Sequence, residues 1–599
     1  MISRKVVYML GFIALLILVG IDIALTLQNS SPIIAIPASQ LKMDGVPSDY
    51  QTNVALVRSD ESFMNSPQSL SAVLSNDEII EMTRQVLDLS GDLEPLLFAG
   101  AKVTIKPNIV ELADVGNGVN TDPRVVEGLI RWMEERGPGD LHYTIAEGGG
   151  GWLSSDWAGT KYNSGGAPVG DGFDRAGYKD AQMRLAEDGI QVDLVDADFG
   201  TMEDPLQGIR LVQTPDFIDF IEYGEYWIHE AFLDMDVLIN VPVMKIHTPQ
   251  ITVCLKNYIG VAAGAKYGTY KGQGGPNPGD PFGLHQDWPG RNSIEREIIE
   301  LASIAPSDYC LVDAIVCKER AKTASSPAVR RNMLIAGADM AAVDSVCTRL
   351  MGLNPDDVPH LCEASREGLG TMNPDQIEII GEHSIEDSMY YFERTPQGSQ
   401  GNRGHFGMNN RLWLLNSSPG ADLDADHLGA PDEEIVGKPG QNGWTEPIFF
   451  SDDIIDFEAY YESSADVSYY AFSWIEVPEE QDAELWISHD ENCAVWIGGE
   501  QVYRKNVRYQ EAALPDHSSQ TIHLKKGRFP LLVKLLDAVG NAPFIMNICR
   551  ILPTRLPAGK ATYPNLTTST NYRRYEGTRV VGLTFDLGES SGVETWPNY

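Results

Sequence analysis

Apolar residues repeat with two different spacings along this chain, and the spacing changes near residue 410. Between about residues 76 and 385, segments with apolar residues at helical spacing alternate with short apolar runs. The helical segments include 293–304 and 340–351, and the short runs include 101–107, 309–314 and 236–244. Because such alternation is typical of βαβ units, the pattern predicts an α/β fold with a mostly parallel sheet and helices on both faces.

End signals mark several of the predicted helices. The sequence SNDE at 75–78 has the form of a capping box, in which a serine and a glutamate cap the first helical turn. Asp122 stands before Pro123, an arrangement that is typical of a helix start, and Gly137 follows that helix. The run DVLINVPVM at 236–244 is apolar almost throughout, which predicts a parallel strand buried on both faces.

The helical spacing disappears after residue 410. Residues 445–555 contain short alternating segments such as VSYYAFSWIEV and AELWISH, separated by turns. This pattern predicts an antiparallel, jelly-roll-like β-sandwich. We therefore divide the chain into an N-terminal segment 1–30, a linker 31–75, an α/β domain 76–385, a connector 386–440, a β-sandwich 441–555 and a tail 556–599 that could add one strand.

The N-terminal segment is apolar enough to enter a membrane. Residues 6–27 carry a single charge, Asp22, and follow Arg4 and Lys5. About 20 apolar residues span a bilayer as a helix, and a basic flank favours a cytoplasmic N-terminus. A cleaved signal peptide is the alternative. Both interpretations place the rest of the chain outside the cytoplasm, either anchored through 6–27 or secreted after cleavage.

The composition excludes some classes of function. The chain has 599 residues, 45 basic and 85 acidic side chains, and a net charge of −40. Such an acidic surface repels phosphate backbones, which argues against nucleic-acid binding. The seven cysteines form no C-x-x-C motif, which argues against an iron–sulfur cluster.

Polar side chains follow the predicted strands of the α/β domain. In an open parallel sheet, ligands bind beyond the carboxyl ends of the strands. We therefore predict that these side chains meet at one edge. The predicted site residues are Lys106, Asn108, Glu147, Lys245, His247, Lys256, Asn257, His285 in the glycine-rich segment 260–290, Asp313, and Asp344 within the helix 340–351.

The residue types favour two kinds of chemistry. Lysines suit an anionic ligand, and a histidine with lysines and carboxylates suits proton abstraction or a divalent metal held by His247. We assign catalytic roles to His247, Lys245 and Lys106, and ligand binding to the remaining site residues. Ordinary structural roles are the alternative: lysines at strand ends, Lys256 and Asn257 at a helix end, Asp313 as a cap, and His285 in a solvent-exposed loop.

Several motifs resemble one family. VTIKPNIV, DVLINVPVMKIHTPQITVCLKNYIG, LVDAI and AGADMAAVDSVCTRLMG followed by EGLG are similar to the bacterial and archaeal "domain of unknown function 362" family, over about residues 50–385. The resemblance implies no settled activity. Many members carry an iron–sulfur segment, whose clustered cysteines this chain lacks. The matching motif positions are Lys106, Asn108, Lys245, His247, Lys256, Asn257 and Asp344.

The C-terminal region resembles a second group of proteins. AELWISHDENCAVWIGGEQVYR is similar to sugar-binding jelly rolls of the protective-antigen or glycosidase-accessory type. Asp490, Glu491 and Trp496 fall where such modules carry a D-x-x-x-V-x-I-x-G run, which implies a glycan partner, although Trp486 and Trp496 also suit a core. Two hypotheses result: an enzyme-like protein with the strand-end site, or a non-enzymatic cell-surface protein whose sandwich holds glycan.

Overall fold

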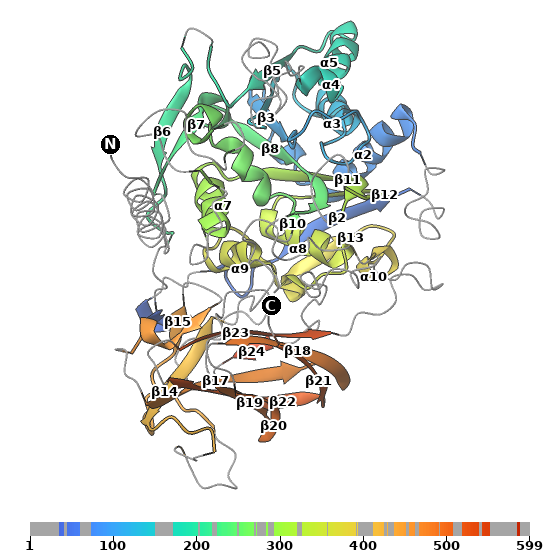
Figure 1. The fold of residues 1–599 in the computed structure, drawn as a ribbon. Coiled ribbons are helices and arrows are strands. Elements are labelled where there is room, and N and C mark those ends of the chain that lie inside the picture. The colour runs from blue at the N-terminus through green and yellow to red at the C-terminus, as the bar shows by residue number, and fades with distance from the viewer. Residues whose placement is uncertain are drawn as a thin grey trace, which may run out of the picture.

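The computed structural model contains an α/β module and a β-sandwich, which lie one above the other (Figure 1). The structure describes residues 35–40, 45–59, 73–149, 172–201, 204–218, 224–247, 251–268, 271, 283–284, 293–319, 326–355, 358–390, 392, 411–424, 428, 436–450, 454–461, 466–489, 492–506, 518–537, 542–550 and 584–586. Residues 6–27 lie outside this set. Across the described residues, no helix is both long and apolar enough to cross a membrane.

The α/β module is built on a ten-stranded, mostly parallel sheet, as the alternating pattern predicts. Its main strand order is β13 (Ile377–Ile380), β2 (Thr52–Arg58), β12 (Ala328–Gly337), β11 (Tyr309–Lys318), β8 (Val237–Val241), β3 (Lys102–Pro107), β4 (His142–Glu147) and β5 (Val192–Asp196). Only β12 in this row runs antiparallel to its neighbours. The short strands β9 (Val243–Ile246) and β10 (Ile251–Thr252) complete the sheet.

Helices cover both faces of this sheet and give it two separate cores. One core contains apolar side chains of α2 (Asn76–Ser90), α3 (Pro123–Arg136) and α5 (Tyr178–Glu187). The other contains those of α7 (Ser293–Ile304), α8 (Met340–Leu350) and α9 (Pro359–Arg366). The predicted end signals are present: Ser75 and Glu78 form a capping box on α2, and Asp122 caps α3 ahead of Pro123. Shorter elements include α4 (Gly172–Arg175), α6 (Gly264–Tyr267), α10 (Ile385–Ser388) and a hairpin of β6 (Ile209–Gln213) with β7 (Glu225–His229).

The run 236–244 forms two strands, where the sequence predicts one. β8 pairs with β3 and β11. β9 continues beside β11, and the chain then turns back so that β10 pairs with β9. Pro242 separates them, because proline has no N–H to donate to a strand ladder. The break lets β9 leave β3 at the point where β3 ends, and this divergence makes room for a pocket.

The predicted linker 31–75 is partly structured, which corrects that boundary. Residues 52–58 form β2, a strand inside the large sheet that pairs with β12 and β13. Residues 35–37 form β1, which pairs with β15 (Ile448–Phe450) of the sandwich. β1 is followed only by the short η1 (Ala38–Gln40), and residues 59–75 separate β2 from α2, so neither strand stands out in the alternating pattern.

The C-terminal region is an antiparallel sandwich, as predicted, but it begins earlier. One sheet contains β1, β15, β14 (Leu412–Pro419), β17 (Val467–Val477), β22 (Gly527–Asp537), β19 (Cys493–Ile497), β20 (Glu500–Lys505) and β24 (Thr584–Asp586). The other contains β16 (Ile455–Asp456), β23 (Pro543–Arg550), β18 (Gln481–His489) and β21 (Ser518–Leu524). A shared core joins the two sheets. β14 lies in the predicted connector, and β24 supplies the strand predicted in the tail.

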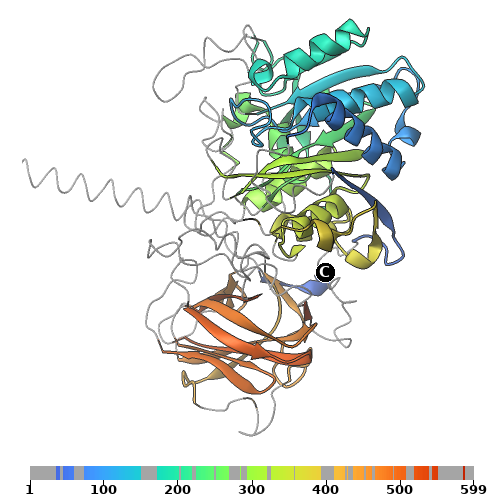
Figure 2. The same ribbon diagram turned by 90° about the vertical axis from the view of Figure 1, so that its right-hand side faces the viewer.

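Buried charges connect the two modules. The Arg411 guanidinium, just before β14, lies 3.0 Å from the Glu363 carboxylate on α9. Arg366, also on α9, contacts Glu363 at 2.7 Å and lies over the Phe449 ring of β15, 5.8 Å from its centroid. The sandwich is therefore attached to the α/β module at α9, and Figure 2 shows the sandwich below the yellow helices of that module.

Candidate functional site

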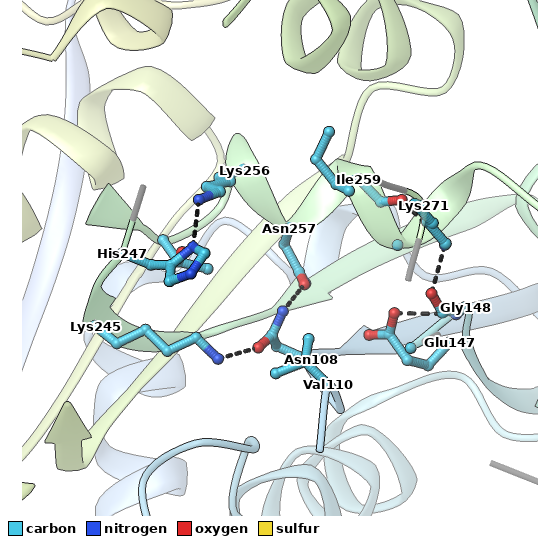
Figure 3. A pocket seen from close by; sticks show the side chains of 13 residues that line it. Asn108, Val110, Glu147, Gly148, Lys245, His247, Lys256, Asn257, Ile259 and Lys271 are labelled. Carbon is cyan, nitrogen blue, oxygen red and sulfur yellow. Dashed lines mark hydrogen bonds between the residues drawn. The ribbon is translucent and has the colours of Figure 1, made fainter. Parts of the chain in front are cut away.

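A pocket of about 80 Å³ lies at the carboxyl ends of the parallel strands. Its polar lining comes from segments that are distant in the sequence (Figure 3). Those lining residues are Asn108, Glu147, Lys245, His247, Thr252, Lys256, Asn257 and Lys271. The broken strand 236–244 and the turn after β10 bring the lysines and the histidine to this edge.

A buried ion pair forms the inner wall of the pocket. The Lys106 ammonium, at the end of β3, lies 2.9 Å from the Glu147 carboxylate at the end of β4. Lys106 also donates to the Pro107 carbonyl and to Asn257 Oδ1, each at 3.3 Å. Burial lowers the pKa of Lys106 and raises the pKa of Glu147, and their mutual attraction opposes both shifts.

A second buried ion pair lies beside the first. Lys271 Nζ is 3.1 Å from Asp198 Oδ1 and donates to the carbonyls of Gly148 at 2.5 Å and Ile259 at 3.1 Å. An ammonium has three N–H groups, so these three acceptors match its donors. We therefore assign Lys271 a structural role: it holds the chain that follows η7 (Lys256–Val261) against the end of β4.

Three asparagines carry a chain of hydrogen bonds through the site. Lys245 Nζ donates to Asn108 Oδ1 and to the Val119 carbonyl. Asn108 Nδ2 donates to Asn257 Oδ1 at 2.7 Å, and Asn257 Nδ2 donates to Asn240 Oδ1 at 2.8 Å. Because each amide both donates and accepts, its orientation is fixed. The asparagines thus position Lys245 and Lys106.

Lys256 and His247 form the outer part of the site. The Lys256 ammonium lies 3.0 Å from His247 Nδ1, and the Lys256 side chain is 6% exposed. Lys256 begins η7, and the turn before it is held by Asp344 of α8, whose carboxylate accepts from the backbone N–H groups of Cys254 and Leu255 at 2.7 and 3.1 Å.

Two glycines allow the chain to approach these charges closely. A Cβ atom on Gly149 would lie 1.6 Å from the Ile109 carbonyl oxygen, and one on Gly260 would lie 2.2 Å from Glu147 Oε1. No side chain fits at either position without moving the backbone or the buried pair. This requirement explains part of the glycine content around the site.

The structure brings most of the predicted site residues together. Six of them line the pocket, and Lys106 lies directly behind Glu147 and Asn257. Asp344 supports the turn that carries Lys256. Asp313 lies elsewhere: its carboxylate accepts from the N–H groups of Asp122 at 2.8 Å and Ile315 at 2.9 Å, as expected of a cap. His285 lies outside the described residues.

Four residues in or behind the pocket were not predicted from the sequence: Lys271, Asp198, Asn240 and Thr252. Asp198 follows the end of β5, so extending the strand-end rule to that strand would have found it. Asn240 is the one polar residue inside the apolar run of β8, which was a usable signal. Lys271 is one of several polar residues in a glycine-rich segment, and no local pattern distinguishes it.

A metal site at His247 stays a prediction. Within the described part of the chain, no group of three or more His, Cys, Asp or Glu side chains is arranged to hold a metal ion. Lys256 lies against Nδ1 of His247, so any metal would have to bind the other ring nitrogen.

Comparison with protein families agrees with the motifs that meet at this pocket. Residues 103–349 match the model of the domain of unknown function DUF362. The predicted resemblance is confirmed. The matched region, residues 103–349, contains both buried ion pairs, the three asparagines and the Lys256–His247 contact. No curated protein matches the chain.

Solved structures match mainly short parts of the chain. A β-glucosidase from Kluyveromyces marxianus is 11% identical over 24% of this chain and 17% of its own, with a TM-score of 0.17. The PA14 sugar-binding domain from an RTX adhesin is 15% identical over 17% of this chain and 51% of its own, with a TM-score of 0.13. A family 35 carbohydrate binding module from Clostridium thermocellum is 12% identical over 16% of this chain and 93% of its own, with a TM-score of 0.12. The chain spans less than half of the β-glucosidase and of an anti-sigma factor domain-containing protein, of which it covers 42%.

The tryptophans of the sandwich lie mostly inside it. Trp486 is 6% exposed, and its Nε1 donates to Glu484 at 2.9 Å. Trp496 is half-buried and packs beside Phe472 and Leu532. Asp490 and Glu491 lie outside the described residues. Glycan binding by this module stays a prediction.

Proposed function

We propose that the DUF362 domain binds a small anionic molecule that carries a carboxylate or phosphate group. The supporting observation is the lining of the pocket: among the described lining residues, three lysines and a histidine face a single glutamate. Such a lining in a chain with a net charge of −40 concentrates positive charge at one place.

Among the described residues of the site, the summed charge stays positive in whichever way the buried pairs share their protons. Lys106 with Glu147 and Lys271 with Asp198 each sum to zero. Lys245 and Lys256 add two positive charges to the described lining. Ammonium groups at a partly desolvated site bind carboxylate or phosphate through charge-assisted hydrogen bonds.

The size of the pocket restricts the ligand. A volume of about 80 Å³ holds on the order of half a dozen water-sized groups. We propose inorganic phosphate or a short carboxylic acid as the ligand class. Proton transfer to or from such an acid by His247 or Lys106 is the enzymatic form of this hypothesis. The location of the protein outside the cytoplasm remains a prediction from residues 1–27.

Calorimetric titration of the full chain tests the proposal. We expect phosphate or malonate to bind, and an uncharged molecule of similar size, such as glycerol, not to bind. Lys245→Met and Lys256→Met should each weaken binding by about tenfold or more, because each removes a charge-assisted hydrogen bond. Lys102→Met is the matched control, since Lys102 is exposed at the start of β3. Equal affinity in all three variants would contradict an anion site at this edge.

A further inference from the structure

The contact between Lys256 and His247 restricts where the imidazole carries its proton. The Lys256 ammonium lies 3.0 Å from His247 Nδ1. A charged ammonium has N–H donors and no acceptor. It can therefore form this hydrogen bond only with a ring nitrogen that has a free lone pair, so Nδ1 must be unprotonated.

The doubly protonated imidazole is disfavoured at this place. It would set a second positive charge 3.0 Å from the first, with N–H groups facing each other, in a partly buried setting. The neutral ring with its proton on Nε2 satisfies the contact. A nearby imidazole behaves consistently: burial and then the Lys256 charge lower the pKa of His360 to about 3.

From this geometry we infer that Lys256 fixes the tautomer of His247, and that His247 binds the anion as a hydrogen-bond donor through Nε2–H. The donor role rests on the proposed function, whereas the tautomer does not. His247 lines the pocket together with Lys245 and Lys256, so an anion in the pocket lies among all three groups. This narrows the enzymatic hypothesis: His247 acts in any reaction as a hydrogen-bond donor to the ligand, and another group abstracts the proton.

The tautomer can be measured directly in the full-length protein. The chain has 11 histidines, so selective ¹⁵N-histidine labelling gives a small set of signals, and the signal that disappears in His247→Gln is the one from His247. We expect long-range ¹H–¹⁵N correlation at pH 7 to show an unprotonated Nδ1 and a protonated Nε2 for His247. Lys256→Met should produce a mixture of both tautomers. A proton on Nδ1, or on both nitrogens, in the unmutated protein would overturn the inference.

Two matched substitutions test the donor role. The side-chain amide of His247→Gln reaches the position of Nε2 and can donate there, while that of His247→Asn reaches only the position of Nδ1. In phosphate or malonate titrations, His247→Gln should keep the affinity within about threefold, and His247→Asn should lose about tenfold or more. The same loss in both variants, or the reverse order, would refute the donor role. If the tautomer is as expected but no anion binds the unmutated protein, the proposed function fails and the donor role fails with it.

Discussion

At the scale of single residues, His360 carries a polar ring inside the core of the α/β module. It is fully buried on α9, and neither ring nitrogen has a hydrogen-bond partner among the described residues. Burial, with the nearby charge of Lys256, lowers its pKa to about 3. The unfolded chain therefore binds more protons than the folded chain between pH 6.5 and 3, and this group lowers stability as the pH falls through that range.

His360→Leu should be neutral or stabilising at pH 7, because it removes a buried polar ring that makes no hydrogen bond to the described residues. At pH 4.5 it should stabilise the protein by about 2–3 kcal/mol relative to the unmutated chain. Urea unfolding at the two pH values measures both effects. A loss of more than about 2 kcal/mol at pH 7 would show that the imidazole makes an essential interaction.

Residue types at strand ends predicted much of the site, because parallel strands place their carboxyl ends at one edge. Lys106, Asn108, Glu147, Lys245 and His247 were found in this way. The same rule grouped Asp313 with them, although the Asp313 carboxylate accepts a hydrogen bond from the backbone N–H of Asp122, away from the pocket. The rule ignores the alternation of side chains along a strand, so it does not say toward which face of the sheet a side chain points.

At the scale of elements, the turn between β10 and η7 depends on α8. Asp344 accepts from two backbone N–H groups of this turn, and burial raises the pKa of Asp344 to about 7. The folded chain thus holds a proton that the unfolded chain releases above pH 3.8. The contribution of Asp344 to stability is largest below that pH and falls as the pH rises toward 7.

Asp344→Asn should reduce this dependence on pH and destabilise the protein by about 1–2 kcal/mol, because an amide offers one oxygen where two N–H groups need acceptors. Binding of phosphate should weaken as well, since the turn positions Lys256. Thermal unfolding and calorimetry provide the readouts, with Asp193→Asn on exposed β5 as the control. An unchanged affinity for phosphate would show that this turn does not position Lys256 for binding.

Elements with their own helix or strand period could be predicted from the sequence, and the others could not. The capping box at Ser75 and the alternation from α2 to α8 are local signals, and both were informative. Pro242 is a sequence signal for the break, but the apolar residues on both sides of it also fit one continuous strand. β2 is recognised only through pairing with β12 and β13, and such distant pairing leaves no local period.

At the scale of the whole molecule, the buried charges on α9 join the sandwich to the α/β module. Burial raises the pKa of Glu363, but Arg366 and Arg411 outweigh this effect, so its pKa is lowered overall. The ionised pair therefore stabilises the junction above the ordinary carboxyl pKa of 4.5, and this stabilisation is lost as the pH falls.

Glu363→Ala should leave two arginines buried without this partner and destabilise the junction by about 3–5 kcal/mol. Differential scanning calorimetry should then show the sandwich and the α/β module unfolding in separate transitions. Glu386→Ala, which removes an exposed carboxylate near Arg349, is the control. A single unshifted transition in Glu363→Ala would mean that the Glu363 ion pairs on α9 do not couple the unfolding of the two modules.

The most direct test of the anion site is a crystal structure of the protein grown with selenate, a dianion that anomalous scattering locates. We expect a selenium peak in the pocket, with selenate oxygens within hydrogen-bond distance of Lys245 Nζ, Lys256 Nζ and His247 Nε2. An empty pocket at saturating selenate, or a peak held only by other residues, would contradict the account.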